Sequence, residues 1–530
     1  MNYFCMYFDI CQYRANTLLD GCTPYRSCHT ASVIDRVRRL ARVRPVTLLA
    51  ALSIIVTCCT ISPDAVTASR GTSGQVTSTT VPGPSIDAAL VGAPGLGDDY
   101  YPNYGNGGYD VTHYAISIIW NNDERSIDAE TTIDLVTTMD LARFNLDLFG
   151  LNVSQVLVDG SAAGFSRDGR ELIITPTATI PKDSPAQVTI TYSGVPQLVP
   201  TTGAPFSGGW TDTDDEIVVV GEPEGASGWY PVNEHPLDKA TYQITVTADT
   251  SLAVASNGVL AERIESGDTT TWTYRSNHPQ APYLTTLAIG DLLPHSEPPT
   301  TSGVEIRHWF AKRLFAEAVA TMEPTSDMIE VFESMFGTYP FDIYGSVVID
   351  EELGFALETQ TLSVFGGDIV SVDGIFDDVV AHELAHQWFG NHVSLSQWSD
   401  IWLNEGFATY AEYLWFEAAD PSYDIDDEVE ADYIFLSSVT DLDTPPGAPP
   451  ADDLFNSSVY VRGSFTLHAL RRTVGDDAFF TILATWVDEF GGGSAETSDF
   501  IQLSEEVSGM DLGEFFDDWL FRDEMPRLPR

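Results

Sequence analysis

Two histidines and a glutamate within residues 381–410 constrain this chain more than any other feature. His382, Glu383 and His386 form an H-E-x-x-H pattern. On a helix, residues four positions apart lie on the same face, so both imidazoles can reach one metal ion. Glu405 follows His386 after eighteen intervening residues and can supply a third ligand if the chain turns and returns as a second helix. Three protein ligands plus a water are the arrangement of a catalytic zinc site, so we expect one Zn²⁺ per chain in a hydrolase.

A chance occurrence is the alternative explanation for an isolated H-E-x-x-H pattern. Here Val380, Leu384 and Trp388, also four positions apart, predict an apolar face on the opposite side of the first helix. Glu405 stands in the context N-E-G-F, at the start of the expected return helix. The helix pair and the third ligand together favour a zinc site over coincidence.

The same residues resemble a known family. The sequence HELAHQWFGN followed by WSDIWLNEGFATY is similar to the aminopeptidase N-like family of zinc exopeptidases, which are gluzincins. The resemblance covers roughly residues 109–525. It implies an N-terminal antiparallel β domain followed by a thermolysin-like α+β zinc peptidase domain, without the C-terminal helical domain that the family usually has.

Three more segments carry the resemblance. Residues 354–360 resemble the family's G-x-M-E-N strand, with Glu358 as its glutamate, although Leu357 replaces the methionine. Glu222-Pro223 resembles a segment whose glutamate reaches the active site. The resemblance implies that Glu358 and Glu222 bind the substrate's amino group; the alternatives are a strand-end acid and a surface acid. Tyr460 resembles the family tyrosine that donates a hydrogen bond to the tetrahedral intermediate.

The Glu222 segment departs from the family pattern in two ways. His235 stands where the family has an acid, and the arginine expected near Ser227 is missing. Elsewhere, Asp400 could orient a zinc ligand or cap a helix, and we expect His308, His392 and His468 to be structural. Glu383 is the expected general base.

The remaining sequence predicts the domain order. Tyr114, Ile116 and Ile118 alternate with more polar residues, which predicts strands, and similar runs recur to about residue 293. We therefore place the β domain at 107–295 and the catalytic domain at 296–530. Within the latter we expect a helix over 315–336, a strand over 347–350 and a last amphipathic helix over 512–521. The acidic, Pro-containing stretch 421–456 is expected to be a solvated loop.

The first 106 residues predict export. A basic cluster at 36–44, an apolar run at 46–56 and the small residues Val66-Thr67-Ala68 have the order of a secretory signal. We expect a leader over 1–68 and a flexible Ser/Thr/Gly/Pro linker over 69–106. A secreted protein is the first expectation; a lipid-anchored or membrane-tethered protein at the outer face of the cytoplasmic membrane is the alternative. All six cysteines lie within residues 1–59, so the folded part has no disulfides.

The charge excludes some partners. The chain has 25 basic and 78 acidic residues, a formal net charge of -53. Such a charge disfavours nucleic-acid binding and electrostatic binding to anionic membranes. It is typical of a protein kept soluble at high salt or, more simply, of an acidic secreted protein.

Together these features predict a secreted zinc aminopeptidase that acts on peptides, with no stable membrane insertion after processing. The sequence does not predict its oligomeric state. A zinc endopeptidase is the nearest alternative, and a catalytically silent surface-binding protein is another.

Overall fold

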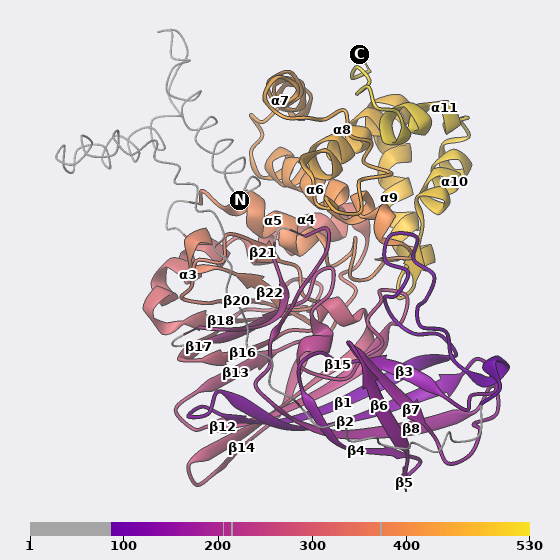
Figure 1. Ribbon diagram of the computed structural model, residues 1–530. Helices are drawn as coiled ribbons and strands as arrows, with labels where there is room; N and C mark the ends of the chain where they lie inside the picture. Colours follow the sequence, from indigo (N-terminus) through magenta and orange to yellow (C-terminus); the bar gives the residue numbers. More distant parts are fainter. Residues whose placement is uncertain (1–85, 205, 214–215, 371–373, 530) are drawn as a thin grey trace, which may run out of the picture. The chain divides into compact units, whose positions relative to one another are not determined.

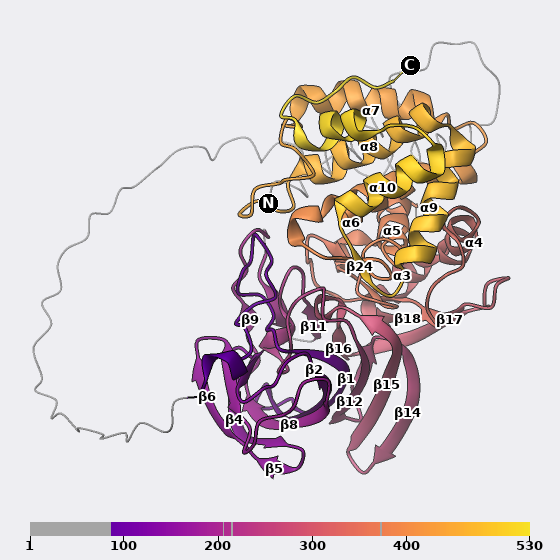
Figure 2. The same ribbon diagram turned by 90° about the vertical axis from the view of Figure 1, so that its right-hand side faces the viewer.

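The alternating pattern that begins at Tyr109 forms the centre of the largest sheet. The computed structural model describes residues 86–529 except 205, 214–215 and 371–373, and these described residues belong to one packed unit. The eight strands of this sheet, in spatial order (Figures 1 and 2), are β14 (Val259–Ser266), β15 (Thr269–Gln280), β12 (Ala240–Asp249), β1 (Tyr109–Asn121), β2 (Ser126–Thr137), β8 (Pro185–Gly194), β4 (Asn152–Val158) and β5 (Ser161–Ala162).

The predicted antiparallel pairing holds throughout this sheet except at one place. β1 and β12 run parallel, with Tyr114 opposite Tyr242. The same alternation of buried and exposed residues serves both parallel and antiparallel neighbours, so the sequence pattern could not distinguish them.

Two smaller sheets complete the β region. One consists of β13 (Ala253–Ser256), β16 (Leu287–Gly290), β11 (Ile217–Val220), β10 (Gly208–Asp212) and β9 (Leu198–Val199). The other consists of β3 (Phe144–Asp147), β7 (Glu171–Thr175) and β6 (Gly164–Asp168).

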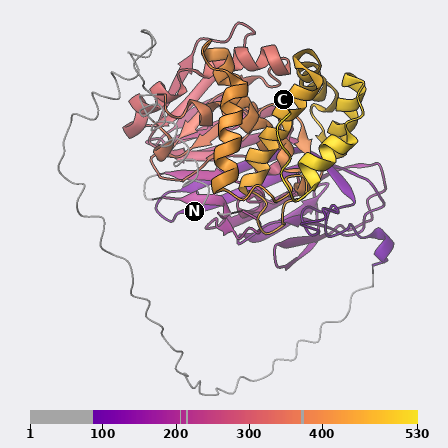
Figure 3. The same ribbon diagram turned by 90° about the horizontal axis from the view of Figure 1, so that it is seen from above.

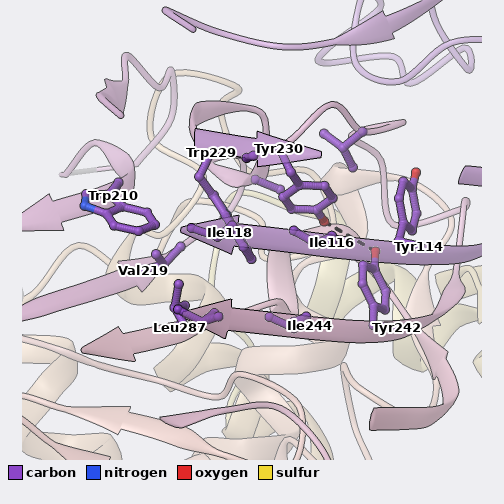
Figure 4. Close-up of a cluster of buried hydrophobic side chains, with 14 of the residues drawn as sticks. Tyr114, Ile116, Ile118, Trp210, Val219, Trp229, Tyr230, Tyr242, Ile244 and Leu287 are labelled. Carbon is purple, nitrogen blue, oxygen red and sulfur yellow. Dashed lines mark hydrogen bonds between the residues drawn. The ribbon is translucent and has the colours of Figure 1, made fainter. Parts of the chain in front are cut away.

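The hydrophobic core of the β region also anchors the loop that carries Glu222. Trp229 and Tyr230 from this loop are fully buried and belong to the same cluster as Tyr114 of β1. The Tyr230 hydroxyl lies 3.4 Å from that of Tyr242 in β12 (Figure 4). The side chains of Trp229 and Tyr230 therefore anchor the loop in the core, seven and eight residues after Glu222. The other labelled members of this cluster in Figure 4 are Ile116, Ile118, Trp210, Val219, Ile244 and Leu287.

The catalytic region combines a mixed sheet with helices. The strands are β17 (Leu292–Glu297), β18 (Glu305–Ala311), β20 (Ser346–Val348), β22 (Ser363–Phe365) and β21 (Ala356–Leu357), with β19 (Ile343–Tyr344) paired to β18. The helices are α3 (Phe315–Met322), α4 (Thr325–Phe336), α5 (Asp377–Ala385), α6 (Trp402–Ala419), α7 (Ile425–Val439), α8 (Ser457–Val474), α9 (Asp476–Phe490), α10 (Thr497–Ser508) and α11 (Gly513–Phe516). β23 (Ser394–Leu395) and β24 (Ser494–Ala495) form a separate parallel pair. Seen from above, the orange and yellow helices lie over the strands (Figure 3).

The sequence and the structure agree on the β and α+β order and differ in detail. The boundary predicted at 295/296 falls inside β17, whose partner β18 belongs to the catalytic sheet. The single helix expected over 315–336 is two helices, because Pro324 lacks the N–H that a continuous helix needs. The last helix, expected over 512–521, is α11 followed by one wider helical turn, Asp517–Phe521.

The expectation of a solvated loop over 421–456 was wrong for its first part. Residues Ile425–Val439 form α7, and the side chain of Asp424 caps it by accepting hydrogen bonds from two backbone N–H groups of the first turn. Three acidic side chains in that turn also interact favourably with the positive end of the helix dipole. Ile425, Val429 and Leu436 are buried at helical spacing beneath the acidic surface.

The described part of the predicted linker also differs from expectation. Residues 86–106 include a short 3₁₀ turn, Ala88–Leu90, and pack against the rest of the chain, with Asp98, Tyr101 and Tyr104 buried. Isolated side chains anchor this segment, so its sequence shows no repeating pattern of apolar residues. The predicted leader, 1–68, and the linker up to residue 85 lie outside the described residues. No helix of the described chain combines the length and the apolar character needed to cross a membrane.

Candidate active site

The H-E-x-x-H pattern lies at the end of α5. His382 and Glu383 belong to the helix, and His386 follows its last residue with backbone angles that are still helical, φ -57° and ψ -23°. Val380, Leu384 and Trp388 are fully buried, which agrees with the apolar face expected for this helix. The apolar side holds α5 in place while both imidazoles face α6.

The third predicted ligand meets both imidazoles. Glu405 lies in the first turn of α6, which packs against α5. Its Oε2 lies 3.4 Å from Nε2 of His382 and 3.5 Å from Nε2 of His386. The ligand atoms of the three residues lie within 4.8 Å of one another.

The far nitrogens of both imidazoles have acceptors. Nδ1 of His382 lies 2.9 Å from Oε1 of Glu412, and Nδ1 of His386 lies 3.1 Å from the carbonyl oxygen of Phe389. An Nδ1–H that donates to an oxygen leaves Nε2 as the free lone pair, which is the tautomer that binds a metal. Two imidazole nitrogens and one carboxylate oxygen form a zinc donor set, so these residues fit the expected ion.

Glu412 was not among the residues predicted from the sequence. It lies seven positions after Glu405 on α6, two helical turns along the same face. That spacing was the signal that could have identified it. We expected Asp400 either to orient a ligand or to cap a helix. It does not cap α6; its Oδ1 accepts a hydrogen bond of 2.6 Å from the Thr497 hydroxyl, and its carboxylate also bonds the backbone of Thr497, the first residue of α10.

A close helix crossing brings Tyr460 to the site. A Cβ on Gly406 of α6 would lie 2.9 Å from the backbone carbon of Gly463, and a Cβ on Gly463 of α8 would lie 3.0 Å from Cα of Gly406. Only two glycines allow α6 and α8 to approach this closely. The contact is one residue after Glu405 and three after Tyr460, whose ring lies 6.1 Å from that of His382 at an angle of 18°.

The imidazoles and the carboxylates shift one another's pKa values. Burial favours the neutral form of both histidines, but the carboxylate of Glu405 and, at His382, that of Glu412 outweigh it and raise the pKa of each imidazole. Burial likewise opposes ionisation of Glu405, yet the two imidazoles lower its pKa to about 2. Glu405 is therefore an anion across the whole useful pH range.

Glu383 has the environment of a proton acceptor. It is buried, and its Oε2 has no hydrogen-bond partner among the described residues. Burial raises the pKa of Glu383 to about 8; the nearby histidines oppose this shift, and Glu358 and Glu405 add to it. A carboxyl group tuned towards neutral pH suits general acid–base work.

The two glutamates expected to bind an amine lie beside the ligands. Glu222 and Glu358 are buried, and carboxylate oxygens of both lie within 4.8 Å of each other and of Glu405. Each has an Oε1 without a hydrogen-bond partner in the described chain. Burial first, and then neighbouring carboxylates, raise the pKa of Glu222 and Glu358; at Glu358 the two histidines partly oppose the shift.

The residues after the H-E-x-x-H pattern hold Glu358 in place. Side-chain N–H groups of Gln387 and Asn391 donate to the backbone carbonyl of Glu358 at 3.1 and 2.6 Å. The carbonyl of Asn391 in turn accepts a 3.0 Å hydrogen bond from Nζ of Lys239, which precedes β12. The zinc helix, the Glu358 strand end and the β region are thus tied together.

An arginine from another element contacts the segment near Ser227, where the sequence lacks the expected arginine. Arg170, in the turn between β6 and β7, donates to Glu224, to Oε2 of Glu234 at 2.6 Å and to Oγ of Ser227 at 3.4 Å. Nε2 of His235, which stands where the family has an acid, lies 3.5 Å from Oδ2 of Asp98. Both departures from the family pattern therefore have partners in the structure.

The histidines expected to be structural have partners away from the zinc ligands. His308 lies 3.2 Å from Glu297, and His468 lies 3.2 Å from the Tyr410 hydroxyl. The ring of His392 lies 5.9 Å from that of Phe341.

The fold and the donor set define a zinc metallopeptidase preceded by a β domain. Residues 320–519 match the Peptidase family M1 domain, and residues 111–284 match the Peptidase M1 N-terminal domain. The structure is similar to that of an M1 zinc metallopeptidase from Deinococcus radiodurans, with a TM-score of 0.76 and 30% identity over 82% of this chain and 99% of that one. A variant of that M1 zinc metallopeptidase has been solved bound to a Tyr-Ser-Ala substrate. The chain belongs to peptidase family M1, which confirms the resemblance and the expected zinc ion.

Curated relatives are longer proteins. The chain is 25% identical over 416 residues to "Probable aminopeptidase 1" of Sulfurisphaera tokodaii, which covers 72% of this chain and 50% of that protein. It is 26% identical over 316 residues to "Aminopeptidase M1" of Arabidopsis thaliana, covering 56% of this chain and 36% of that protein. The chain thus matches between about a third and a half of the length of these two relatives.

Proposed function

We propose that the protein is a zinc aminopeptidase that removes N-terminal residues from peptides. One observation carries the proposal. Two buried carboxylates, Glu222 and Glu358, each with an unpartnered oxygen, lie within 4.8 Å of the ligand Glu405. Buried acids without partners are costly, and a substrate ammonium would supply both the missing charge and the missing hydrogen-bond donors.

The position of these acids explains why cleavage would occur at the first peptide bond. An ammonium held between Glu222 and Glu358 sits directly beside the metal ligands, so the nearest carbonyl is that of the first residue. Charge-assisted hydrogen bonds contribute about 1.5–3 kcal/mol each. An N-acetylated terminus would bring one uncharged amide N–H in place of a charged ammonium with three donors, and could not pair with both acids.

The chain's own groups then perform the proton transfers. When bound to His382, His386 and Glu405, zinc supplies a Lewis acid that polarises the scissile carbonyl and lowers the pKa of water. Glu383, with its free Oε2, takes the proton from the attacking water and passes it to the leaving amine. The Tyr460 hydroxyl, from the α8 side of the site, donates to the developing oxyanion, and a donor of this kind contributes about 3 kcal/mol.

Product analysis tests the proposal. A pentapeptide with a free N-terminus should be shortened one residue at a time, and mass spectrometry should detect the released amino acids in order. The N-acetylated form of the same peptide should remain intact, and zinc chelation should stop the reaction. Internal cleavage of the blocked peptide at a comparable rate would instead indicate a zinc endopeptidase. Absence of hydrolysis with zinc bound would indicate the binding protein without catalysis.

Export is part of the same proposal and rests on the sequence alone. The basic cluster at 36–44, the apolar run at 46–56 and the site at Val66-Thr67-Ala68 support cleavage before Ser69. N-terminal sequencing of the native protein should start near Ser69, in the material outside the cytoplasm. Native protein that retains residues 1–30 would contradict the export proposal and leave the peptidase proposal untouched.

A further inference from the structure

We propose that residues 96–106, the N-terminal strap, hold the loop that carries Glu222 in its working position, with Tyr104 as a positioning residue for recognition of the substrate amine. The Glu222 loop is residues 221–235. The inference rests on the proposed function, because it assigns to the strap a share in amine binding. The strap lies outside both matched family regions, which cover residues 111–284 and 320–519.

The Glu222 loop needs support from outside the site. Glu222, Glu358 and Glu405 bring carboxylate oxygens within 4.8 Å of one another. Like charges at this distance in a buried site repel strongly. Oε1 of Glu222 has no hydrogen-bond partner among the described residues, so little at the side chain itself resists the repulsion.

Tyr104 contacts the loop close to Glu222. Its hydroxyl donates to one carboxylate oxygen of Glu224, two residues after Glu222, and Arg170 donates to the other oxygen. The Arg170 guanidinium also lies over the Tyr104 ring, 5.3 Å from its centre. Glu224 is buried, so each of these bonds is shielded from water.

The same network fixes the backbone of the loop. Arg170 donates to Oε2 of Glu234 at 2.6 Å. Oε1 of Glu234 then accepts the backbone N–H groups of Gly225 and Ser227 at 2.7 and 3.1 Å. A continuous network of hydrogen bonds therefore connects the strap to the backbone that follows Glu222.

The strap also joins the loop to the turn that precedes α6, the helix of Glu405. Nδ1 of His235 accepts the N–H of Leu237 at 3.1 Å, so Nε2 carries the proton and faces Oδ2 of Asp98 at 3.5 Å. The same Oδ2 accepts the N–H of Trp398 at 2.8 Å, seven residues before Glu405. One strap carboxylate therefore contacts both segments that bring Glu222 and Glu405 together.

Two stacked tyrosines offer a matched pair of variants. Tyr101 and Tyr104 stack with ring centres 4.6 Å apart, and each changes to phenylalanine with the loss of one hydroxyl. The Tyr104 hydroxyl binds Glu224 of the loop. The Tyr101 hydroxyl binds the carbonyls of Thr202 and Ala451, outside the loop. Tyr104→Phe tests the proposal, and Tyr101→Phe controls for the general effect of losing a buried hydroxyl from the strap.

Two measurements on the zinc-loaded full chain decide the matter. Tyr104→Phe should raise KM for a free-amine aminoacyl amide by about three- to tenfold, the ratio that corresponds to one lost hydrogen bond, with kcat changed less than about twofold. Hydrogen exchange at Gly225 and Ser227 should become faster. Tyr101→Phe should change neither, whatever it does to the melting temperature.

An unchanged KM or unchanged exchange in Tyr104→Phe, or equal changes in both variants, would overturn the proposal. Failure of the proposed function looks different, because the wild type would then not prefer free-amine substrates. In that case the exchange measurement alone still decides whether the strap holds the loop.

Discussion

Replacing Glu412 with glutamine should weaken zinc binding about tenfold while leaving all three ligands in place. Oε1 of Glu412 lies 2.9 Å from Nδ1 of His382, and both side chains are less than a tenth exposed, at 8% and 9%. A hydrogen bond to a charged group contributes about 1.5–3 kcal/mol, against about 1 for a neutral one. Glutamine keeps a neutral acceptor, so the loss is about 1–2 kcal/mol, or about five- to thirtyfold, which overlaps the ten- to hundredfold range typical of such partners.

A competition titration with a chelator of known zinc affinity measures this effect directly. Glu417→Gln is the matched control, since Glu417 lies five residues further along α6 and binds Arg471 at 2.8 Å rather than a zinc ligand. The control should retain the zinc affinity of the wild type. An affinity of Glu412→Gln within about twofold of the wild type, or an equal loss in the control, would refute the role assigned to Glu412.

Four other predictions concern the base, the helix crossing and the charge. Glu383→Gln should keep about one zinc per chain by metal analysis and lose turnover by several orders of magnitude; retained turnover would exclude Glu383 as the base. Gly463→Ala should cost about 1–3 kcal/mol in denaturant unfolding, because its Cβ would lie 3.0 Å from Cα of Gly406; unaltered stability would mean that the helices can separate freely. Burial, and then Asp110, raises the pKa of Asp238 to about 8 in the folded chain. Folding therefore takes up a proton between about pH 4 and 8, and the contribution of Asp238 to stability declines as the pH rises through that window. The melting temperature of Asp238→Asn should therefore rise relative to that of the wild type from pH 5 to pH 8, and a constant difference would contradict the assignment. With a net charge of -53, the melting temperature should rise between low salt and molar NaCl, and a flat or falling curve would count against charge repulsion.

The zinc ligands were predictable because they depend on local spacing. His382 and His386 share a helix face through their separation alone, and Glu405 needs only a turn and a second helix. The same reasoning would have found Glu412 from its seven-residue spacing to Glu405 on α6.

Residues that depend on long-range packing were beyond the sequence pattern. Glu222 reached the predicted site only through family resemblance, because nothing in its local spacing relates it to α5. Arg170 contacts Glu224 from a turn more than fifty residues earlier in the chain, and no sequence periodicity predicts such a contact.

Composition misled the prediction where few side chains do the anchoring. The strap looked like a linker because Asp98, Tyr101 and Tyr104 act singly, without a repeating apolar face. α7 looked like a loop because its acids were counted as solvated. In the structure Asp424 caps the helix, and the acids of the first turn interact favourably with the positive end of the helix dipole.

The central claim is that a buried pair of glutamates selects a free substrate amine. The most direct test is the ratio of kcat/KM for an aminoacyl amide to that for its N-acetyl form, measured in the wild type and in Glu358→Gln. The wild-type ratio should be large, and Glu358→Gln should reduce it about ten- to a hundredfold by losing activity on the free amine, since one charge-assisted bond contributes about 1.5–3 kcal/mol. A wild-type ratio near one, or a ratio that Glu358→Gln leaves unchanged, would contradict the account.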